Sequence, residues 1–136
     1  MSRPQVVLDT DILSALMRKN RHVIAQARAY LLEHGQFTIS IITRYEILRG
    51  LKAKQAAQQI TRFEAFCVRN EILTITDEVI VMAAEIYADL YRRGELIGDA
   101  DILIAATAMA NGFGVATNNE DHFRRVAGLQ IENWQK

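Results

Sequence analysis

Short apolar runs rich in β-branched residues alternate with longer stretches of helical periodicity along most of this chain. The runs predict strands at residues 6–8, 37–42, 72–75 and 114–117. Helices are expected over residues 12–17, 22–32, 45–54, 58–68, 78–93 and 100–110. Strands that alternate with helices in this way favour a parallel sheet covered on both faces. We therefore predict an α/β fold, a three-layer α/β/α sandwich whose central parallel sheet has four to five strands, the last one around Leu129 and Ile131.

Length and composition indicate one globular domain, which we place at residues 1–136. Half of the residues are hydrophobic and 24% are charged, as is usual for a folded domain of this size. The single cysteine, Cys67, excludes an intrachain disulfide framework and a cysteine metal site, and it favours a reducing, cytoplasmic setting. No run approaches the roughly 20 apolar residues that span a bilayer, so no membrane association is expected. Sixteen basic and 16 acidic side chains give zero net charge, so any binding of nucleic acid must be local.

Acidic residues stand at three junctions between the predicted elements. Asp9 directly follows the first apolar run, and Asp11 lies two residues further on. Glu46 falls in the first or second turn of the helix after the second run, while Asp99 and Asp101 open the helix expected at residues 100–110. Ligands of open α/β sheets bind beyond the carboxyl ends of the strands. All five acids are therefore expected to face one cleft.

Each acid also has a structural interpretation. An Asp at a helix start is a favoured N-cap, worth about 1 kcal/mol, and this would account for Asp9, Asp11 and Asp99. Glu46 would form a weak surface pair with Arg49, three residues later. Capping does not explain Asp101, which lies inside a helix made otherwise of Ile, Leu and Ala. A carboxylate in such surroundings is desolvated unless a cation compensates it.

A divalent metal ion would supply that cation. Mg²⁺, or alternatively Mn²⁺, prefers oxygen ligands and is commonly held by a few carboxylates together with water and substrate phosphate. Asp9 and Asp101 are predicted to be the principal ligands, and Glu46 and Asp99 would complete the shell directly or through water. The expected chemistry is hydrolysis of a phosphodiester by a metal-activated water, with one or two ions.

Four passages carry a resemblance to a known family: LDTDILSAL at 8–16, SIITRYEILRGL at 40–51, IGDADILIAATAMANG at 97–112 and VATNNEDHFRRVAGLQIENW at 115–134. The chain resembles PIN-domain ribonucleases, and more narrowly the VapC-type toxins of toxin–antitoxin pairs. The family's acids correspond to Asp9, Glu46 and Asp101, with Asp99 as an additional acid before the last of these.

Two positions depart from the family pattern. Asp11 stands where many members have Asn, which either strengthens metal binding or provides only a cap. Asn119 stands where a fourth acid is common, and its amide oxygen is a candidate metal ligand, with Asp121 close by.

The resemblance implies endoribonuclease activity on a structured RNA, homodimerisation and neutralisation by a cognate VapB-type antitoxin. Such an antitoxin would insert an Arg-bearing segment into the acidic cleft, and a helix-in-groove docking mode would suit the first half of the chain.

Other polar residues are interpreted more simply. The basic residues are expected to be mostly solvated, with occasional phosphate contacts, and they include Arg44, Arg49, Lys52, Lys54, Arg92, Arg93, Arg124 and Arg125. His122, beside Phe123, is expected to pack or cap instead of catalysing. Thr117 has a slightly better case as a residue that holds a carboxylate.

Two other classes of protein remain open at this stage. The acid pair Asp9 and Asp11 is also compatible with a haloacid-dehalogenase-like phosphatase, although the lysine motif and cap region of that class are not evident. A non-catalytic PIN-like interaction module would keep the fold and bind only a partner.

Overall fold

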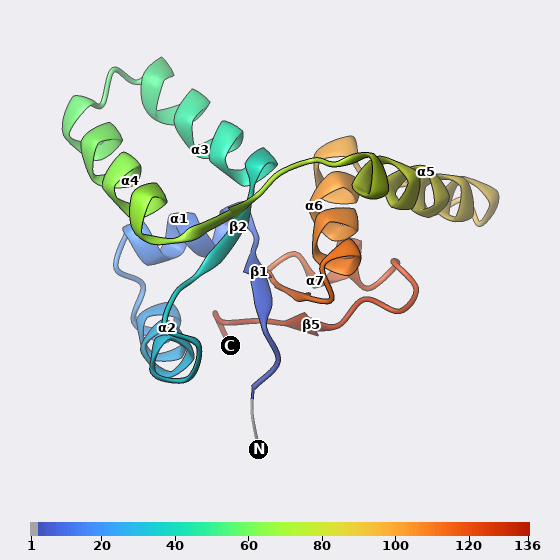
Figure 1. Cartoon of the computed structure of the whole chain (residues 1–136), viewed down its shortest axis with the longest axis horizontal. Coiled ribbons are helices and arrows are strands. Elements are labelled where there is room, and N and C mark those ends of the chain that lie inside the picture. Colours follow the sequence, from blue (N-terminus) through green and yellow to red (C-terminus); the bar gives the residue numbers. More distant parts are fainter. Residues whose placement is uncertain (1–2) are drawn as a thin grey trace.

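A computed structural model describes residues 3–136, in which helices surround five short strands (Figure 1). The strands are β1 (Val6–Leu8), β2 (Thr38–Ser40), β3 (Glu71–Leu73), β4 (Gly114–Ala116) and β5 (Ile131–Glu132). The helices are α1 (Thr10–Met17), α2 (Arg21–His34), α3 (Ile41–Ala53), α4 (Ala57–Arg69), α5 (Asp77–Arg92), α6 (Asp99–Ala110) and α7 (Glu120–Phe123).

All strand pairing in the described residues is parallel. β4 pairs with both β1 and β5, and β2 pairs with β3. β2 also lies against β1, so the strands follow the spatial order β3-β2-β1-β4-β5. Parallel pairing places the carboxyl ends of all five strands at one edge. The predicted α/β architecture with a parallel sheet is confirmed.

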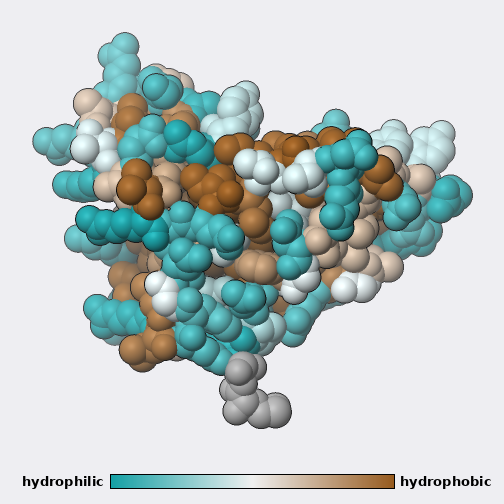
Figure 2. Space-filling view, viewed as in Figure 1, coloured by the Kyte–Doolittle hydropathy of each residue, from teal (hydrophilic) through white to brown (hydrophobic). Residues whose placement is uncertain are grey.

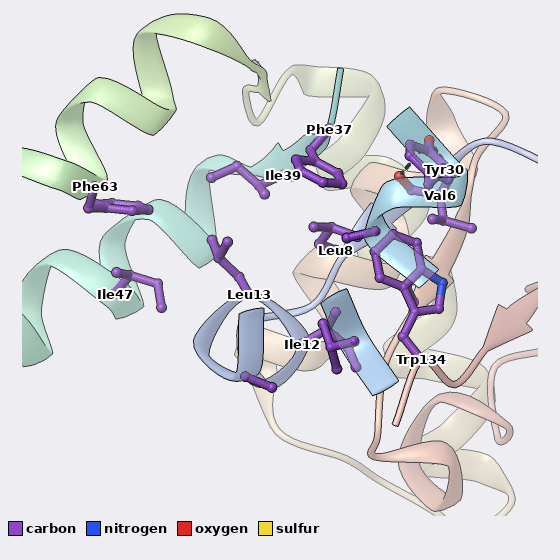
Figure 3. Packing of buried hydrophobic residues seen from close by; sticks show 14 residues of the cluster. Val6, Leu8, Ile12, Leu13, Tyr30, Phe37, Ile39, Ile47, Phe63 and Trp134 are labelled. Carbon is purple, nitrogen blue, oxygen red and sulfur yellow. Dashed lines mark hydrogen bonds between the residues drawn. The ribbon is translucent and has the colours of Figure 1, made fainter. Parts of the chain in front are cut away.

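Alternation along the strands divides the apolar side chains between two cores. Val6 and Leu8 of β1 face one core, and Val7 between them faces the other. The first core packs β1 and β2 against α1–α4, with Trp134 and Tyr30 fully buried in it (Figure 3). The second core packs the opposite face against α5, α6 and Phe123 of α7. Figure 1 shows these two groups of helices on opposite sides of the strands.

Most element boundaries differ from the predictions by a few residues, and three differences bear on the site or on the sheet. The second strand ends at Ser40, not at residue 42, because the Ser40 hydroxyl accepts a hydrogen bond from the Thr43 N–H (3.1 Å) and starts α3 at Ile41. The single turn α7 was not expected. The last strand contains Ile131 but not Leu129.

None of the helices within residues 3–136 combines the length and the apolar character needed to cross a membrane.

Candidate active site

Asp9 lies at the carboxyl end of β1 and is almost completely buried, with 5% exposure. Its N–H donates to the Ala116 carbonyl (2.9 Å), which ties the residue to the end of β4. Its Oδ1 accepts from the Thr10 N–H (2.8 Å), and its Oδ2 accepts from the Thr117 hydroxyl (2.8 Å). Asp9 is therefore the N-cap of α1 and is also held from the neighbouring strand. Thr117 therefore holds a carboxylate, as its place in the sequence suggested.

The carboxylates of Asp11 and Asp101 make a negative charge on Asp9 unfavourable. Burial, followed by the charges of Asp11 and Asp101, raises the pKa of Asp9 to about 7, although the bonds from Thr117 and Thr10 act in the opposite direction. Burial also raises the pKa of Asp11. Asp11 Oδ2 accepts from the Asn118 N–H (3.0 Å), whereas its Oδ1 is buried with no hydrogen-bond partner. Asp11 therefore belongs to the acidic cluster and does not serve as an N-cap.

Asp101 reaches the cluster from the first turn of α6. Its Oδ2 lies 3.0 Å from His122 Nδ1, and the same ring nitrogen lies 2.9 Å from Asn119 Nδ2. His122 thus contacts one of the predicted site acids, a contact that the expectation of packing or capping did not include. No local pattern indicated this contact, because 21 residues separate His122 from Asp101 and the turn α7 brings them together.

Asp99 is exposed and occupies the first position of α6, after Gly98 at the N-cap. It is therefore not the cap that its sequence position also allowed. Its side chain makes no hydrogen bond or ion pair in the described structure.

Glu46 is connected to this edge through hydroxyl groups. The Thr10 hydroxyl donates to Glu46 Oε1 (2.6 Å) and lies 3.1 Å from the hydroxyl of Thr43. Glu46 Oε2 lies 3.7 Å from Arg49, so the predicted surface pair also exists, in a loose form. The link through Thr10, the residue next to Asp9, joins the second predicted acid to the first.

The remaining predicted residues lie around this centre. Asn119 contacts His122, and its N–H donates to Thr117 (2.9 Å). Asp121 is exposed. Several of the basic residues are engaged elsewhere: Arg44 with Glu64 (2.6 Å), Arg93 with Asp89 (2.8 Å) and Arg124 with Glu120 (3.2 Å).

The donor set fits a hard divalent cation. Asp9 and Asp11 are desolvated carboxylates that repel each other, and Asp11 has a buried oxygen without a hydrogen-bond partner. A bound cation would compensate this negative charge. Within residues 3–136, no group of three or more Asp, Glu, His or Cys side chains forms a shell that could hold a metal ion. Mg²⁺ needs no such shell, because it retains waters and uses one or two carboxylates together with substrate phosphates.

A groove of about 550 Å³ opens beside Glu46, between α1, α3 and α4. Its lining combines basic, apolar and polar side chains: Thr10, Ser14, Met17, Arg18, Lys19, Glu46, Ile47, Gly50, Leu51, Lys54, Gln59, Arg62, Phe63 and Phe66.

A parallel α/β/α fold with acidic side chains gathered at the carboxyl edge of its sheet defines a class of proteins in which the active site lies beyond the strand ends. The family model of the PIN domain matches residues 6–129, and the chain belongs to this family. The family assignment favours a nuclease over the phosphatase alternative.

Relatives and solved structures agree with this assignment. The chain is 33% identical to Ribonuclease VapC1 of Methanocaldococcus jannaschii over 97% of its own length and 88% of that protein. It is 31% identical to the tRNA(fMet)-specific endonuclease VapC of Shigella flexneri, over 94% and 96% of the two chains. The fold is similar to VapBC2 of Rickettsia felis bound to a DNA fragment from its promoter, with a TM-score of 0.85, 28% identity and coverage of 95% and 98%.

Proposed function

We propose that this chain is a metal-dependent endoribonuclease that acts as the toxin of a VapBC-type toxin–antitoxin pair in the cytoplasm. Its named relatives are ribonucleases and endonucleases. The observation that carries the catalytic proposal is the electrostatic interaction of three carboxylates: burial and the charges of Asp11 and Asp101 raise the pKa of Asp9 to about 7. Such a cluster is costly for folding and is accounted for by binding of a cation and a phosphodiester.

Asp9 and Asp101 would hold the ion, with Glu46, Asp99 and the amide oxygen of Asn119 as further candidates. When bound, Mg²⁺ or Mn²⁺ supplies Lewis acidity and neutralises charge that develops on the phosphate. Thr117 and the Thr10 N–H keep the Asp9 carboxylate oriented, and the Thr10 hydroxyl does the same for Glu46. The chain thus orients its acids from backbone and hydroxyl donors before substrate arrives.

Cleavage assays test the catalytic proposal directly. Purified protein is incubated with total tRNA, with a tRNA(fMet) transcript and with ribosomal RNA, in Mg²⁺, in Mn²⁺ and in chelator. We expect endonucleolytic cleavage only with metal, and a loss of at least about 100-fold in Asp9→Asn and in Asp101→Asn. Asp77→Asn is the matched control, because Asp77 is an exposed acid on α5. Cleavage that persists in both site variants would refute the proposal, and folded protein without any metal-dependent cleavage would favour the non-catalytic module.

We propose that the groove between α1, α3 and α4 receives the antitoxin. Structures similar to this chain include VapBC complexes from Rickettsia felis and Haemophilus influenzae. The basic side chains Arg18, Lys19, Lys54 and Arg62 complement an acidic segment, while Phe63 and Phe66 provide apolar contacts for a helix. Glu46, also in the lining, would pair with an Arg from that segment.

Charge reversal in the groove tests this partner. In a pull-down with the product of a small reading frame adjoining this one, Lys54→Glu combined with Arg62→Glu should weaken capture at least about tenfold. Arg21→Glu, on the exposed start of α2, is the control. Unchanged capture by the groove variant would place the antitoxin elsewhere.

We also propose that the chain forms a homodimer through α5. Large hydrophobic side chains are exposed along this helix, namely Ile80 (49%), Val81 (52%), Tyr87 (45%) and Tyr91 (64%). Solvent-exposed apolar groups that gather on one helix are typical of an interface.

A further inference from the structure

Within the described residues, His122 is the side chain that hydrogen-bonds Asp101. It lies on the one-turn helix α7, with its Nδ1 3.0 Å from Asp101 Oδ2. The next residue, Phe123, is fully buried in the second core, so α7 is anchored against α6 independently of the His122 side chain. His122 is itself 41% exposed, so burial of its ring does not explain its position.

The 3.0 Å contact between Nδ1 and Asp101 Oδ2 is a hydrogen bond in the ring tautomer that carries hydrogen on Nδ1, because a lone pair there would be repelled by the carboxylate. In that tautomer, the 2.9 Å contact between Asn119 Nδ2 and Nδ1 is satisfied by the alternative assignment of the amide, with its oxygen toward the ring. Asp101 Oδ1 accepts no hydrogen bond in the described structure and stays available to another partner.

The first turn of α6 offers the Asp101 carboxylate another orientation. The N-cap of α6 is Gly98, which has no side chain to satisfy the free N–H groups of the first turn. In a capping box, a Glu or Gln at the third helical position, where Asp101 lies, reaches back to the N–H of the cap residue. The hydrogen bond from His122 on α7 opposes this rotation, because it holds Oδ2 toward α7.

We propose that His122 is a positioning residue: through its Nδ1–H it holds the Asp101 carboxylate in the orientation that binds the divalent ion. The inference rests on the proposed function, since it assigns a supporting residue to the same metal site. Removal of a group that hydrogen-bonds a metal ligand lowers metal affinity by roughly 10- to 100-fold.

The first test measures metal affinity without RNA. Binding of Mn²⁺ to the full-length protein is followed by calorimetry for wild type, His122→Ala, His122→Asn and His122→Gln, with Asp101→Asn as the loss-of-ligand reference. The Asn amide nitrogen replaces Nδ1 and restores the donor, whereas the Gln nitrogen lies at the position of Nε2. We expect affinity to fall about 10- to 100-fold in His122→Ala and in His122→Gln, and to return close to the wild-type value in His122→Asn.

His22→Ala is the control, because His22 is an exposed histidine on α2. Thermal unfolding in chelator shows whether His122 acts instead by stabilising the fold. The proposal expects the same unfolding midpoint for His122→Ala and His122→Asn. Wild-type affinity in His122→Ala, or affinity in His122→Asn as low as in His122→Ala, would overturn the inference.

The second test separates metal affinity from the rate at saturation. Cleavage of total tRNA is measured across a Mn²⁺ titration, and His122→Ala is expected to need about 10-fold or more Mn²⁺ for half-maximal rate while its rate recovers at saturating metal. A reduced rate that no amount of Mn²⁺ restores would overturn the positioning role. If wild type cleaves and His122→Ala matches it at every Mn²⁺ concentration, the inference fails and the proposed function stands. If wild type neither binds Mn²⁺ nor cleaves, both fail.

Discussion

Asp9 serves two purposes with the same carboxylate. Its Oδ1 caps α1, and its Oδ2 is held by Thr117 from the adjacent strand. Capping stabilises a helix by about 1 kcal/mol, whereas a charge at this depth, beside Asp11 and Asp101, is unfavourable by more than that. The residue is therefore placed for the site at the expense of stability.

This conflict predicts how stability depends on pH. The ordinary pKa of 3.8 applies to the unfolded chain, and the pKa of Asp9 is about 7 in the fold. Between these two pKa values, the folded state binds one proton more than the unfolded state. The contribution of Asp9 to stability is therefore complete below about pH 4 and is lost as pH rises through about 7, by on the order of 4 kcal/mol at most. In chelator, wild type should have a lower unfolding midpoint at pH 8 than at pH 5.

Asp9→Asn should remove most of that pH dependence and be more stable than wild type at pH 8 without metal. Mn²⁺ should raise the midpoint of wild type at pH 8 and leave the variant unchanged. A wild-type midpoint that stays constant from pH 5 to pH 8 would contradict the raised pKa.

Asp11 contributes charge but lacks a full set of partners. Asp11→Asn keeps an acceptor for the Asn118 N–H and removes one negative charge from beside Asp9. We expect the pKa of Asp9 to fall toward its ordinary value, which can be followed by the carboxyl ¹³C shift across a pH titration. An unchanged Asp9 titration would show that the charge of Asp11 has little influence, and Asp121→Asn, an exposed acid, is the control.

At the scale of elements, the strands are very short, and the helix caps decide where they end. Ser40 closes β2 and starts α3, which turns Ile41 and Ile42 from a predicted strand into helix. A run of β-branched residues does not by itself show where a strand ends, because a capping side chain within the run can start a helix there. The early start of α3 places Glu46 in its second turn, where Thr10 reaches it.

The approach of β4 to the last strand depends on a glycine. A Cβ at Gly114 would lie 2.8 Å from the carbonyl oxygen of Gln130, on the backbone that precedes β5. Gly114→Ala should therefore push the two segments apart and lower the free energy of unfolding by about 1–3 kcal/mol, measured by urea denaturation. Gly50→Ala is the matched control, because nothing lies within 4 Å of that Cβ and the residue is inside α3. The control should be neutral or stabilising by up to about 1 kcal/mol, and equal effects of the two changes would contradict the contact.

At the scale of the whole molecule, two cores enclose the sheet and some apolar surface remains outside both. Hydrophobic side chains form a broken band from the α3–α4 pair toward α5 on the face seen in Figure 2. On α5, Tyr87 and Tyr91 stack on each other at 6.1 Å between ring centroids and leave their outer surface exposed.

A single charge on α5 should dissociate the proposed dimer. Wild type is expected to sediment as a dimer at micromolar concentration, and Tyr91→Glu as a monomer with an unchanged unfolding midpoint in chelator. Leu32→Glu is the control, since Leu32 is 90% exposed on α2, away from this helix. A monomeric wild type, or a dimer that survives Tyr91→Glu, would reject α5 as the interface.

Local pattern was sufficient for the fold class and for most of the helices. Alternating strand and helix periods are visible in any short window, and parallel strands then place the residues after them at one edge. Asp9, Glu46 and Asp101 could be named for that reason, and the order of their passages suggested the family. The short turn α7 had no periodic signal, because four residues are too few to show one.

The contacts within the acidic cluster were decided only by tertiary structure. Whether an acid is a cap, a solvated charge or part of a site depends on burial and on neighbours that lie far away in the chain, such as Thr117 beside Asp9 and His122 beside Asp101. Desolvation and Coulomb interactions act through space and leave no local pattern. The sequence alone therefore determined which acids stand at the strand ends, and the fold decided which of them lie buried together and what holds each in place.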